Sequence, residues 1–529
     1  MTTVLRNARI YSPAGNDLSA MVVDGATIAW LGSDDAVDVH AGPGDDVVDL
    51  EGAFVTPAFV DAHVHCTGTG LLLTGLDLSA SGSAVDVLDA VAREALKPGR
   101  VVLGGGWDES RWRYTDDLPD AARLARAAGG KTVYLARVDA HSALVSADLL
   151  TADVASLAGY SADGWLRRDA HDRARERAQS MLGARERERA QRAALAAAAG
   201  LGIACVHEMA GPSISSADDL RDLLALAGGP EWSGPAVTGY WGELGGIETA
   251  LDLGAAGAAG DLFCDGALGS HTAALGYPYA DQPGAPPGVR YDADQIGTHI
   301  AACVHAGLQA GFHAIGDAAV DVVLAGMEKA AAEMGAARTR AGRHRVEHAE
   351  MVSDVARFAD AGLIASMQPA FDAQWGGPEG MYASRLGVSR AGGLNNFAGL
   401  SGAGVALAFG SDSPVTPLNP WAAVRAAAAH TTPRASISPR AAFTAHTRGG
   451  WRAARVDDGS GVLAVGHPAT YAVWSASELA VDAPDERVAR WSTDPRAAVA
   501  GLPDLGPGAA LPTCRTTVLR GRTIFTTAE

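Results

Sequence analysis

Short apolar runs alternate with helical segments over most of the chain. From residue 202 onward, runs of four to eight residues are separated by stretches with helical character, such as 318–334 and 354–361. Runs of this kind, bounded by glycine and polar residues, indicate buried parallel strands. They lie at residues 203–208, 236–241, 262–265, 309–313, 344–348, 363–368 and 405–412. With an earlier strand that ends at residues 63–65, they predict an α/β fold, a (β/α)8 TIM-like barrel.

Polar side chains stand at the ends of most of these apolar runs. The first strand ends in His63 and His65, which lie two positions apart and therefore share one face of a strand. His313, His348 and Asp412 end the fifth, sixth and eighth strands. The carboxyl ends of barrel strands converge on the catalytic face. Imidazole and carboxylate groups are ligands of zinc and related metals, so the sequence predicts a divalent-metal site there.

Strand-like segments punctuated by glycine and aspartate occur at both ends of the chain. The segment 517–525 repeats the pattern of residues 3–11. The simplest organisation is a small composite β-sandwich domain built from residues 1–55 plus 455–529. The barrel, at residues 56–454, is then inserted between its two halves.

A segment of about 68–170, after the first barrel strand, is too elaborate for a simple connection between a strand and a helix. Excursions from the catalytic end of a barrel commonly carry substrate contacts. We expect substrate to be bound by Trp107 and His141 on this insertion. His271 and Gln368, after the fourth and seventh strands, are further candidates.

Charge and composition narrow the class of partner. The net charge of −19 argues against nucleic acid or an anionic membrane. The five cysteines are scattered, with no CxxC pair, so a disulfide framework is not expected. There is no signal-peptide pattern and no apolar run of about 18 residues. These features predict a cytoplasmic protein with a small-molecule substrate.

Several motifs resemble those of a known family. They are His-Val-His at 63–65, Asp-Gly-Ala-Leu-Gly-Ser at 265–270, His-Ala-Ile-Gly-Asp at 313–317, Arg-Val-Glu-His-Ala at 345–349 and Phe-Gly-Ser-Asp-Ser-Pro-Val at 409–415. The chain resembles the amidohydrolase superfamily of metal-dependent hydrolases over essentially its whole length. The similarity is to the amidohydrolase family 3 branch, which includes N-substituted formamide deformylases. The resemblance implies that His63, His65 and Asp412 bind metal, that His313 and His348 complete the site, and that homo-oligomers are common.

One position departs from the family pattern. In many members, a carboxylated lysine on the fourth strand bridges two metals, often four residues before the Asp-Gly pair. Here that position is Asp261, and no lysine occurs between Lys131 and Lys329. A carbamate bridge is therefore excluded. Either one ion is bound, or a carboxylate replaces the bridge, with Glu208 and Asp265 as the candidates.

We favour one ion, held by His63, His65, His313 and Asp412. Zinc is the expected metal, with iron or manganese as alternatives. A metal-bound hydroxide would attack an sp2 carbon, and Asp412 would accept a proton and deliver it to the leaving group. His348 would stabilise the developing oxyanion or bind a second ion.

The expected activity is hydrolysis of a carbon–nitrogen bond other than a peptide bond, of the amide or N-formyl type. A deaminase of a nucleobase-like heterocycle is the nearest alternative, because a single-metal site of this composition also serves that chemistry in related families. A barrel that has lost catalysis and acts as a binding protein is an alternative of a different class. A serine hydrolase is not supported, since the chain has no GxSxG elbow.

Overall fold

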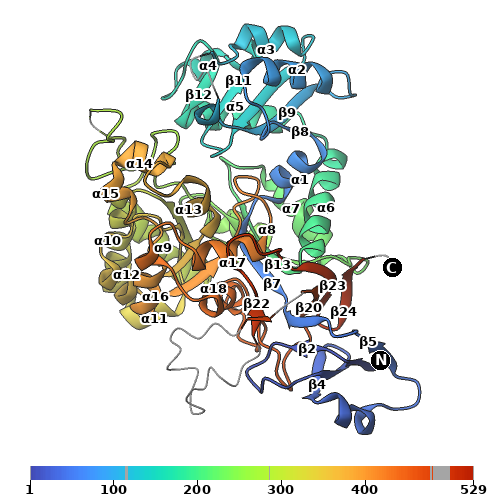
Figure 1. Ribbon diagram of the computed structural model, residues 1–529. Coiled ribbons are helices and arrows are strands. Elements are labelled where there is room, and N and C mark those ends of the chain that lie inside the picture. The colour runs from blue at the N-terminus through green and yellow to red at the C-terminus, as the bar shows by residue number, and fades with distance from the viewer. Residues whose placement is uncertain (1, 113–116, 285, 477–478, 481–500, 528–529) are drawn as a thin grey trace.

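The computed structural model describes residues 2–112, 117–284, 286–476, 479–480 and 501–527. Its centre is an eight-stranded parallel sheet of order β19-β18-β17-β16-β15-β14-β13-β7 (Figure 1). The strands are β7 (Phe59–Val64), β13 (Ile203–Ala210), β14 (Ala236–Trp241), β15 (Gly257–Ala258), β16 (Gln309–Ala314), β17 (Arg345–His348), β18 (Ile364–Met367) and β19 (Ala406–Phe409). A parallel bridge between Val64 and Ser413 joins the two ends of the sheet. The structure confirms the predicted α/β barrel.

The fourth barrel strand differs from its predicted position. The sequence pattern placed it at residues 262–265, but β15 covers only Gly257–Ala258. The chain then turns at Gly260, whose φ of 92° belongs to glycine's range. Any Cβ at Gly260 would lie 2.8 Å from the sulfur of Met209. The turn carries Asp261 into the barrel mouth, and the apolar residues that follow form only one bridge, from Phe263 to His313.

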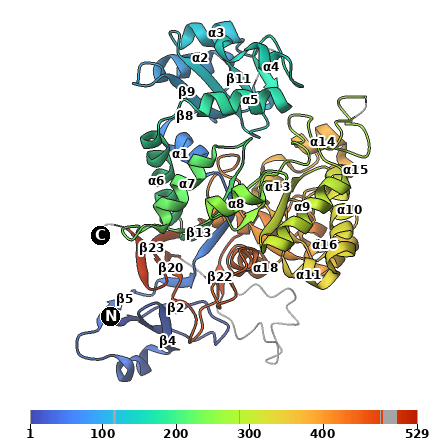
Figure 2. The ribbon, with the colours of Figure 1, turned by 180° about the vertical axis from the view of Figure 1, so that it is seen from behind.

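Helices surround the barrel, as the views from opposite sides show (Figures 1 and 2). The longer ones are α6 (Ala184–Gly200), α7 (Ala217–Gly228), α9 (Ala293–Ala306), α10 (Asp317–Met334) and α17 (Pro420–Ala428). Their apolar faces and the outer faces of the strands form one continuous core. Phe59 at the start of β7 packs edge-on against Trp421 and Trp474, with ring centroids 5.0 and 5.7 Å away. This core fixes β7, which carries His63 and ends one residue before His65.

The segment after β7 and α1 (Cys66–Thr74) forms a lobe at the top of Figure 1. Its five-stranded sheet has the order β12-β11-β10-β9-β8. The strands are β8 (Leu76–Asp77), β9 (Val101–Trp107), β10 (Thr132–Arg137), β11 (Ser142–Val145) and β12 (Trp165–Arg167). Helices α2 (Ala84–Glu94), α3 (Ala121–Ala127) and α5 (Arg168–Gln179) pack against it. We call residues 76–179 the cap lobe.

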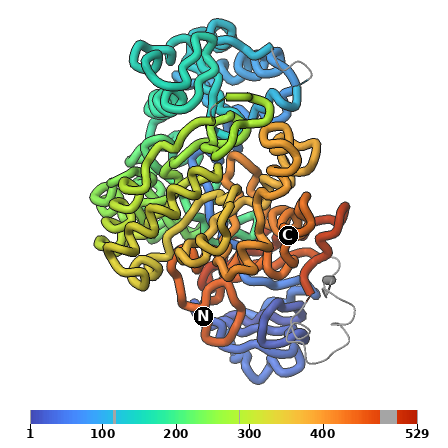
Figure 3. Tube along the Cα trace, turned by 90° about the vertical axis from the view of Figure 1, so that its left-hand side faces the viewer, coloured from blue at the N-terminus to red at the C-terminus, as the bar shows by residue number. Residues whose placement is uncertain are grey.

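Strands from both ends of the chain share one sheet. Its order is β2-β6-β20-β23-β24, and β20 pairs antiparallel with both β6 and β23. These strands are β2 (Arg9–Ile10), β6 (Phe54–Pro57), β20 (Tyr471–Ser475), β23 (Thr513–Leu519) and β24 (Arg522–Thr526). A second sheet, from the N-terminal segment alone, lies at the bottom of Figure 3. The exact division into a composite domain and a barrel stays a prediction.

The described residues contain no helix that is both long and apolar enough to cross a membrane. All five cysteines are free and buried. Because burial raises the pKa of the Cys205 thiol to about 12, that thiol is protonated at neutral pH and is a poor nucleophile.

Candidate active site

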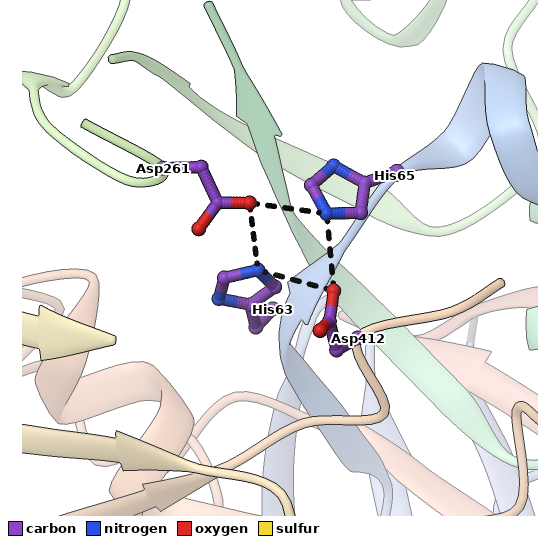
Figure 4. Close-up of side chains that lie close together, drawn as sticks. All are labelled: His63, His65, Asp261 and Asp412. Atoms are coloured by element: carbon purple, nitrogen blue, oxygen red, sulfur yellow. Dashed lines mark ion pairs between the residues drawn. The ribbon is translucent and has the colours of Figure 1, made fainter. Parts of the chain in front are cut away.

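Four buried side chains meet at the mouth of the barrel (Figure 4). The Nε2 atoms of His63 and His65 lie 3.4 and 3.2 Å from Oδ2 of Asp261. The same nitrogens lie 3.4 and 3.0 Å from Oδ1 of Asp412. Two imidazoles and two carboxylates therefore direct one donor atom each at a common point.

A second group adjoins the first and shares Asp261 with it. The other carboxylate oxygen, Oδ1, lies 3.4 Å from Nδ1 of His313 and 3.5 Å from Nε2 of His348. Asp261 therefore presents one oxygen to each pair of histidines.

In each of the four histidines, the ring nitrogen that faces away from the shared centre forms a hydrogen bond to an acceptor. His63 donates from Nδ1 to Oε2 of Glu347 at 3.0 Å, and His348 donates from Nδ1 to Oε1 of Gln368 at 2.8 Å. His65 Nδ1 and His313 Nε2 donate to backbone carbonyls, at 2.9 and 3.2 Å. These hydrogen bonds fix the tautomers, so that the lone pair of each ring points to the shared centre. Metal-binding histidines are oriented in this way.

Several of the inward-facing atoms are buried and have no hydrogen-bond partner. They are Nε2 of His63, Nδ1 of His313, Oδ1 of Asp261 and Oδ1 of Asp412. Leaving such atoms unsatisfied costs free energy unless something occupies the space between them. Zinc bonds of about 2.0–2.1 Å place neighbouring donors of a tetrahedral site about 3.3 Å apart. The first group has this spacing, and its donor set fits a divalent ion.

The two carboxylates also control the histidine protons. Burial alone would lower the pKa of His65, but the hydrogen bonds and charges of Asp261 and Asp412 outweigh it and raise that pKa to about 10. The pKa of His63 is raised for the same reason. A metal ion must displace these protons, so metal binding and proton release are coupled.

Backbone geometry at the eighth strand brings Asp412 against the first strand. Asp412 has a φ of 55°, and its amide donates to the carbonyl of His63 at 2.7 Å. Gly410 permits this approach, because a Cβ there would lie 2.5 Å from the amide nitrogen of His63. The Phe-Gly-Ser-Asp motif thus sets the distance between the two strands that contribute to the first group.

The observed grouping differs from the ligand set favoured from the sequence. His313 lies with His348 and Asp261, not with His63, His65 and Asp412. Asp261 was noted only as the position of the absent lysine, although its place four residues before the Asp-Gly pair was the signal that could have identified it. Asp261 was not identified as a ligand because the apolar run that indicated strand 4 follows it, at residues 262–265.

The two carboxylates predicted as bridges lie in neither group. Oε2 of Glu208 accepts the amide hydrogen of Cys66 at 2.7 Å. Asp265 accepts three backbone amides, from Ala274, Ile315 and Gly316, at 2.8–3.1 Å. Asp265 therefore holds the turns beside His313.

The predicted substrate-binding residues lie in different places. His141 lines a cavity beside His313, with a centroid distance of 5.0 Å between their rings. Trp107 is fully buried in the cap lobe, where its Nε1 donates to the carbonyl of Leu135, so it is a core residue. His271 is hydrogen-bonded through Nε2 to Asp281 at 3.0 Å, and Gln368 orients His348.

Two cavities adjoin the metal-ligand groups. The first lies between α1 and the cap lobe, and its apolar lining includes Leu71, Leu103 and Ile214. The second contains His348, Asp412 and His141 together with aromatic side chains from the segment after β18. Burial raises the pKa of Glu208, in the first cavity, and of Glu350, in the second, to about 7. The cap lobe and the barrel thus both line the space around the candidate centre.

Known proteins resemble the chain over most of its length. It is 28% identical over 514 residues to Protein LONG AFTER FAR-RED 3 of Arabidopsis thaliana, covering 87% of this chain and 84% of that protein. It is 26% identical over 520 residues to the putative amidohydrolase YtcJ of Bacillus subtilis, covering 88% and 93%. A crystal structure of an uncharacterized metal-dependent hydrolase from Pyrococcus furiosus is 25% identical, with a TM-score of 0.70, covering 89% and 98%.

A shorter match concerns the N-substituted formamide deformylase of Arthrobacter pascens. The two chains are 25% identical over 163 residues, which is 30% of each. A model of the amidohydrolase family matches residues 46–525. Because this match includes the whole barrel and both groups of candidate ligands, the chain belongs to the amidohydrolase family and is a metal-dependent hydrolase of that superfamily.

Proposed function

We propose that the protein hydrolyses a carbon–nitrogen bond other than a peptide bond, in an amide or N-formyl substrate. The observation that carries the proposal is the convergence of four buried histidines and two carboxylates, with unsatisfied atoms, between two cavities. The partial similarity to an N-substituted formamide deformylase supports the substrate class.

We further propose that two divalent ions are held, with Asp261 as the shared ligand. His63, His65 and Asp412 would hold one, and His313 and His348 the other. This replaces the single ion favoured from the sequence, because each oxygen of Asp261 faces a different histidine pair. Zinc is the proposed metal, since nitrogen and oxygen donors at tetrahedral spacing suit it. A bound ion would acidify water and polarise the substrate carbonyl.

The chain's own residues supply the remaining steps. The carboxylate of Asp412 accepts the proton of the attacking water and transfers it to the leaving nitrogen. His141, which lines the second cavity beside His313, would donate a hydrogen bond to the substrate. Residues of the cap lobe line both cavities, and exclusion of water by a bound substrate there would strengthen these electrostatic interactions.

A substrate screen on zinc-loaded protein tests the proposed activity. The panel contains N-formyl amines, N-acyl amines and cytosine-like heterocycles, with formate, carboxylate and ammonia measured separately. We expect formate or carboxylate release that falls at least a hundredfold in Asp412→Asn. Ammonia release from the heterocycles alone would instead show a deaminase. No turnover of any compound by metal-loaded protein would overturn the proposal. A cytoplasmic location and a homo-oligomer are retained as predictions.

A further inference from the structure

The second cavity has an aromatic wall, and one of its rings, Phe371, stacks on His348 with 5.8 Å between the ring centroids. Phe371 and Trp375 lie on α13 (Pro369–Trp375), and Tyr382 lies on α14 (Met381–Leu386). The ring centroids of Phe371 and Trp375 are 4.9 Å apart, and those of Trp375 and Tyr382 are 6.2 Å apart. All three side chains line the cavity beside His348.

A carboxylate lies within this aromatic wall. Glu350 lines the cavity and is only 3% exposed, and its Oε2 has no hydrogen-bond partner. Tyr382, also in the lining, and Asn395 are polar neighbours of Glu350: burial raises the pKa of Glu350, and hydrogen bonding by these two side chains partly offsets the rise. Burying Oε2 of Glu350 without a partner is unfavourable, so this carboxylate is suited to a ligand that donates hydrogen bonds.

Within the described part of the chain, Glu350 forms no ion pair with an Arg or Lys. A positive charge that does act on it is that of protonated His348, a proposed metal ligand. Arg137 is the one arginine in the lining of this cavity. Its guanidinium is already paired with three carboxylates, those of Asp108, Glu109 and Asp139, at 2.8–3.0 Å. One guanidinium and three carboxylates give this cluster a net negative charge. The cluster therefore does not repel a cation that enters the cavity.

We propose that the second cavity binds a primary ammonium group on the substrate, through Glu350 and the aromatic rings. A primary ammonium is a donor only, and its N–H groups match the unpaired Oε2 of Glu350. The faces of Trp, Tyr and Phe also attract cations. The inference rests on the proposed function and deepens it: the substrate is an amide or formamide with a second amine on the arm that enters this cavity.

Ligand binding tests the recognition separately from turnover. The probe is 2-phenylethylammonium, compared with neutral 2-phenylethanol at constant ionic strength, on metal-loaded protein. Trp375 provides a fluorescence signal in the cavity, and calorimetry provides an independent one. We expect the ammonium to bind at least tenfold more tightly than the alcohol. In Glu350→Gln, this preference should fall below twofold.

Glu208→Gln is the matched control, since it changes a buried glutamate in the other cavity in the same way. It should keep the preference for the ammonium. Equal affinity for the two probes in wild type, or an unchanged preference in Glu350→Gln, would overturn the proposal and leave Glu350 with water or a structural role. Loss of the preference in Glu208→Gln alone would also overturn it. If Glu350→Gln does not fold, Trp375→Leu must weaken ammonium binding at least fivefold, or the proposal fails.

Kinetics then separate a substrate arm from an amine product. N-formyl-1,4-diaminobutane and N-formylbutylamine differ mainly in the distant ammonium. A substrate arm predicts a lower KM for the diamine derivative, lost in Glu350→Gln. Equal KM values with inhibition by free amines would show that only the product binds there. Ammonium binding without hydrolysis of either compound would refute the proposed function but not the cation site.

Discussion

Oε2 of Glu347 accepts a hydrogen bond from Nδ1 of His63 at 3.0 Å, and Oε1 of Glu347 accepts one from Nε of Arg345 at 2.7 Å. All three side chains are fully buried. Burial alone would raise the pKa of Glu347, but Arg345 and His63 lower it to about 2. The carboxylate therefore stays charged, and it fixes which nitrogen of His63 faces the candidate metal.

Replacing Glu347 by Gln should weaken metal binding about 10- to 100-fold, as loss of such supporting partners does. The amide keeps the shape but removes the charge that holds the tautomer of His63. Competition with a chromophoric chelator measures the affinity. Glu248→Gln, an exposed change on α8 (Ile247–Leu253), is the control and should have no effect. Equal affinities in Glu347→Gln and wild type would show that His63 does not need this partner.

Gly410→Ala should abolish binding of the ion in the first group. The added Cβ meets the backbone of His63 at 2.5 Å, and a backbone contact cannot be relieved by a side-chain rotation. The two strands must separate, which moves Asp412 away from His63. Metal content and thermal unfolding measure the effect. Gly402→Ala, where nothing lies within 4 Å of the new Cβ, should leave both unchanged.

Arg137→Met should destabilise the protein by about 3–5 kcal/mol, because it leaves three carboxylates buried without their partner. Urea unfolding followed by circular dichroism measures the change. Arg123→Met breaks the more exposed pair with Asp117 and should cost at most about 1 kcal/mol. Similar losses in the two variants would contradict the assignment of the Arg137 cluster as buried and essential for stability.

His344 should make the metal-free protein sensitive to acid. Burial, together with Arg455 and His299, lowers its pKa to about 4, against about 6.5 in the unfolded chain. The folded state thus keeps His344 neutral while the unfolded state takes up a proton. This contribution to stability is complete above about pH 6.5 and is lost as the pH falls toward 4.

In His344→Asn, the loss of stability between pH 7.5 and 4 should be smaller by about 3 kcal/mol. The amide oxygen can replace Nδ1, which accepts the amide hydrogen of Ala310. Urea midpoints at the two pH values measure the effect. His305→Asn, at the exposed end of α9, should behave as wild type. An unchanged pH dependence in His344→Asn would rule out this residue as a source of acid sensitivity.

The barrel could be predicted because its signals are local. Strands such as β13 and β16 contain a short, mostly apolar run, and a polar residue such as His207 or His313 follows it toward the catalytic end. Asp261 could not be placed in this way, since β15 is only two residues long and the stronger apolar run follows it. A Cβ at Gly260 would meet the sulfur of Met209, which lies far away in the sequence, so the need for glycine at this bend is not a local signal.

The burial of Trp107 and Glu350 could not be predicted from the sequence either. Trp107 precedes a polar loop and was expected at the substrate, yet it packs in the cap lobe against Trp165. Glu350 was not singled out, because a glutamate two residues after a strand is usually exposed. Its place in a cavity comes from the packing of α13 and α14 around it.

The most direct measurement is the metal content per chain, by plasma mass spectrometry, of wild type and Asp261→Ala after loading with zinc and removal of free metal. We predict two ions per chain in wild type and at most one in the variant, because Asp261 directs one oxygen to each histidine pair. A wild type with one ion that persists in Asp261→Ala, or with none after reconstitution, would contradict the shared-carboxylate centre.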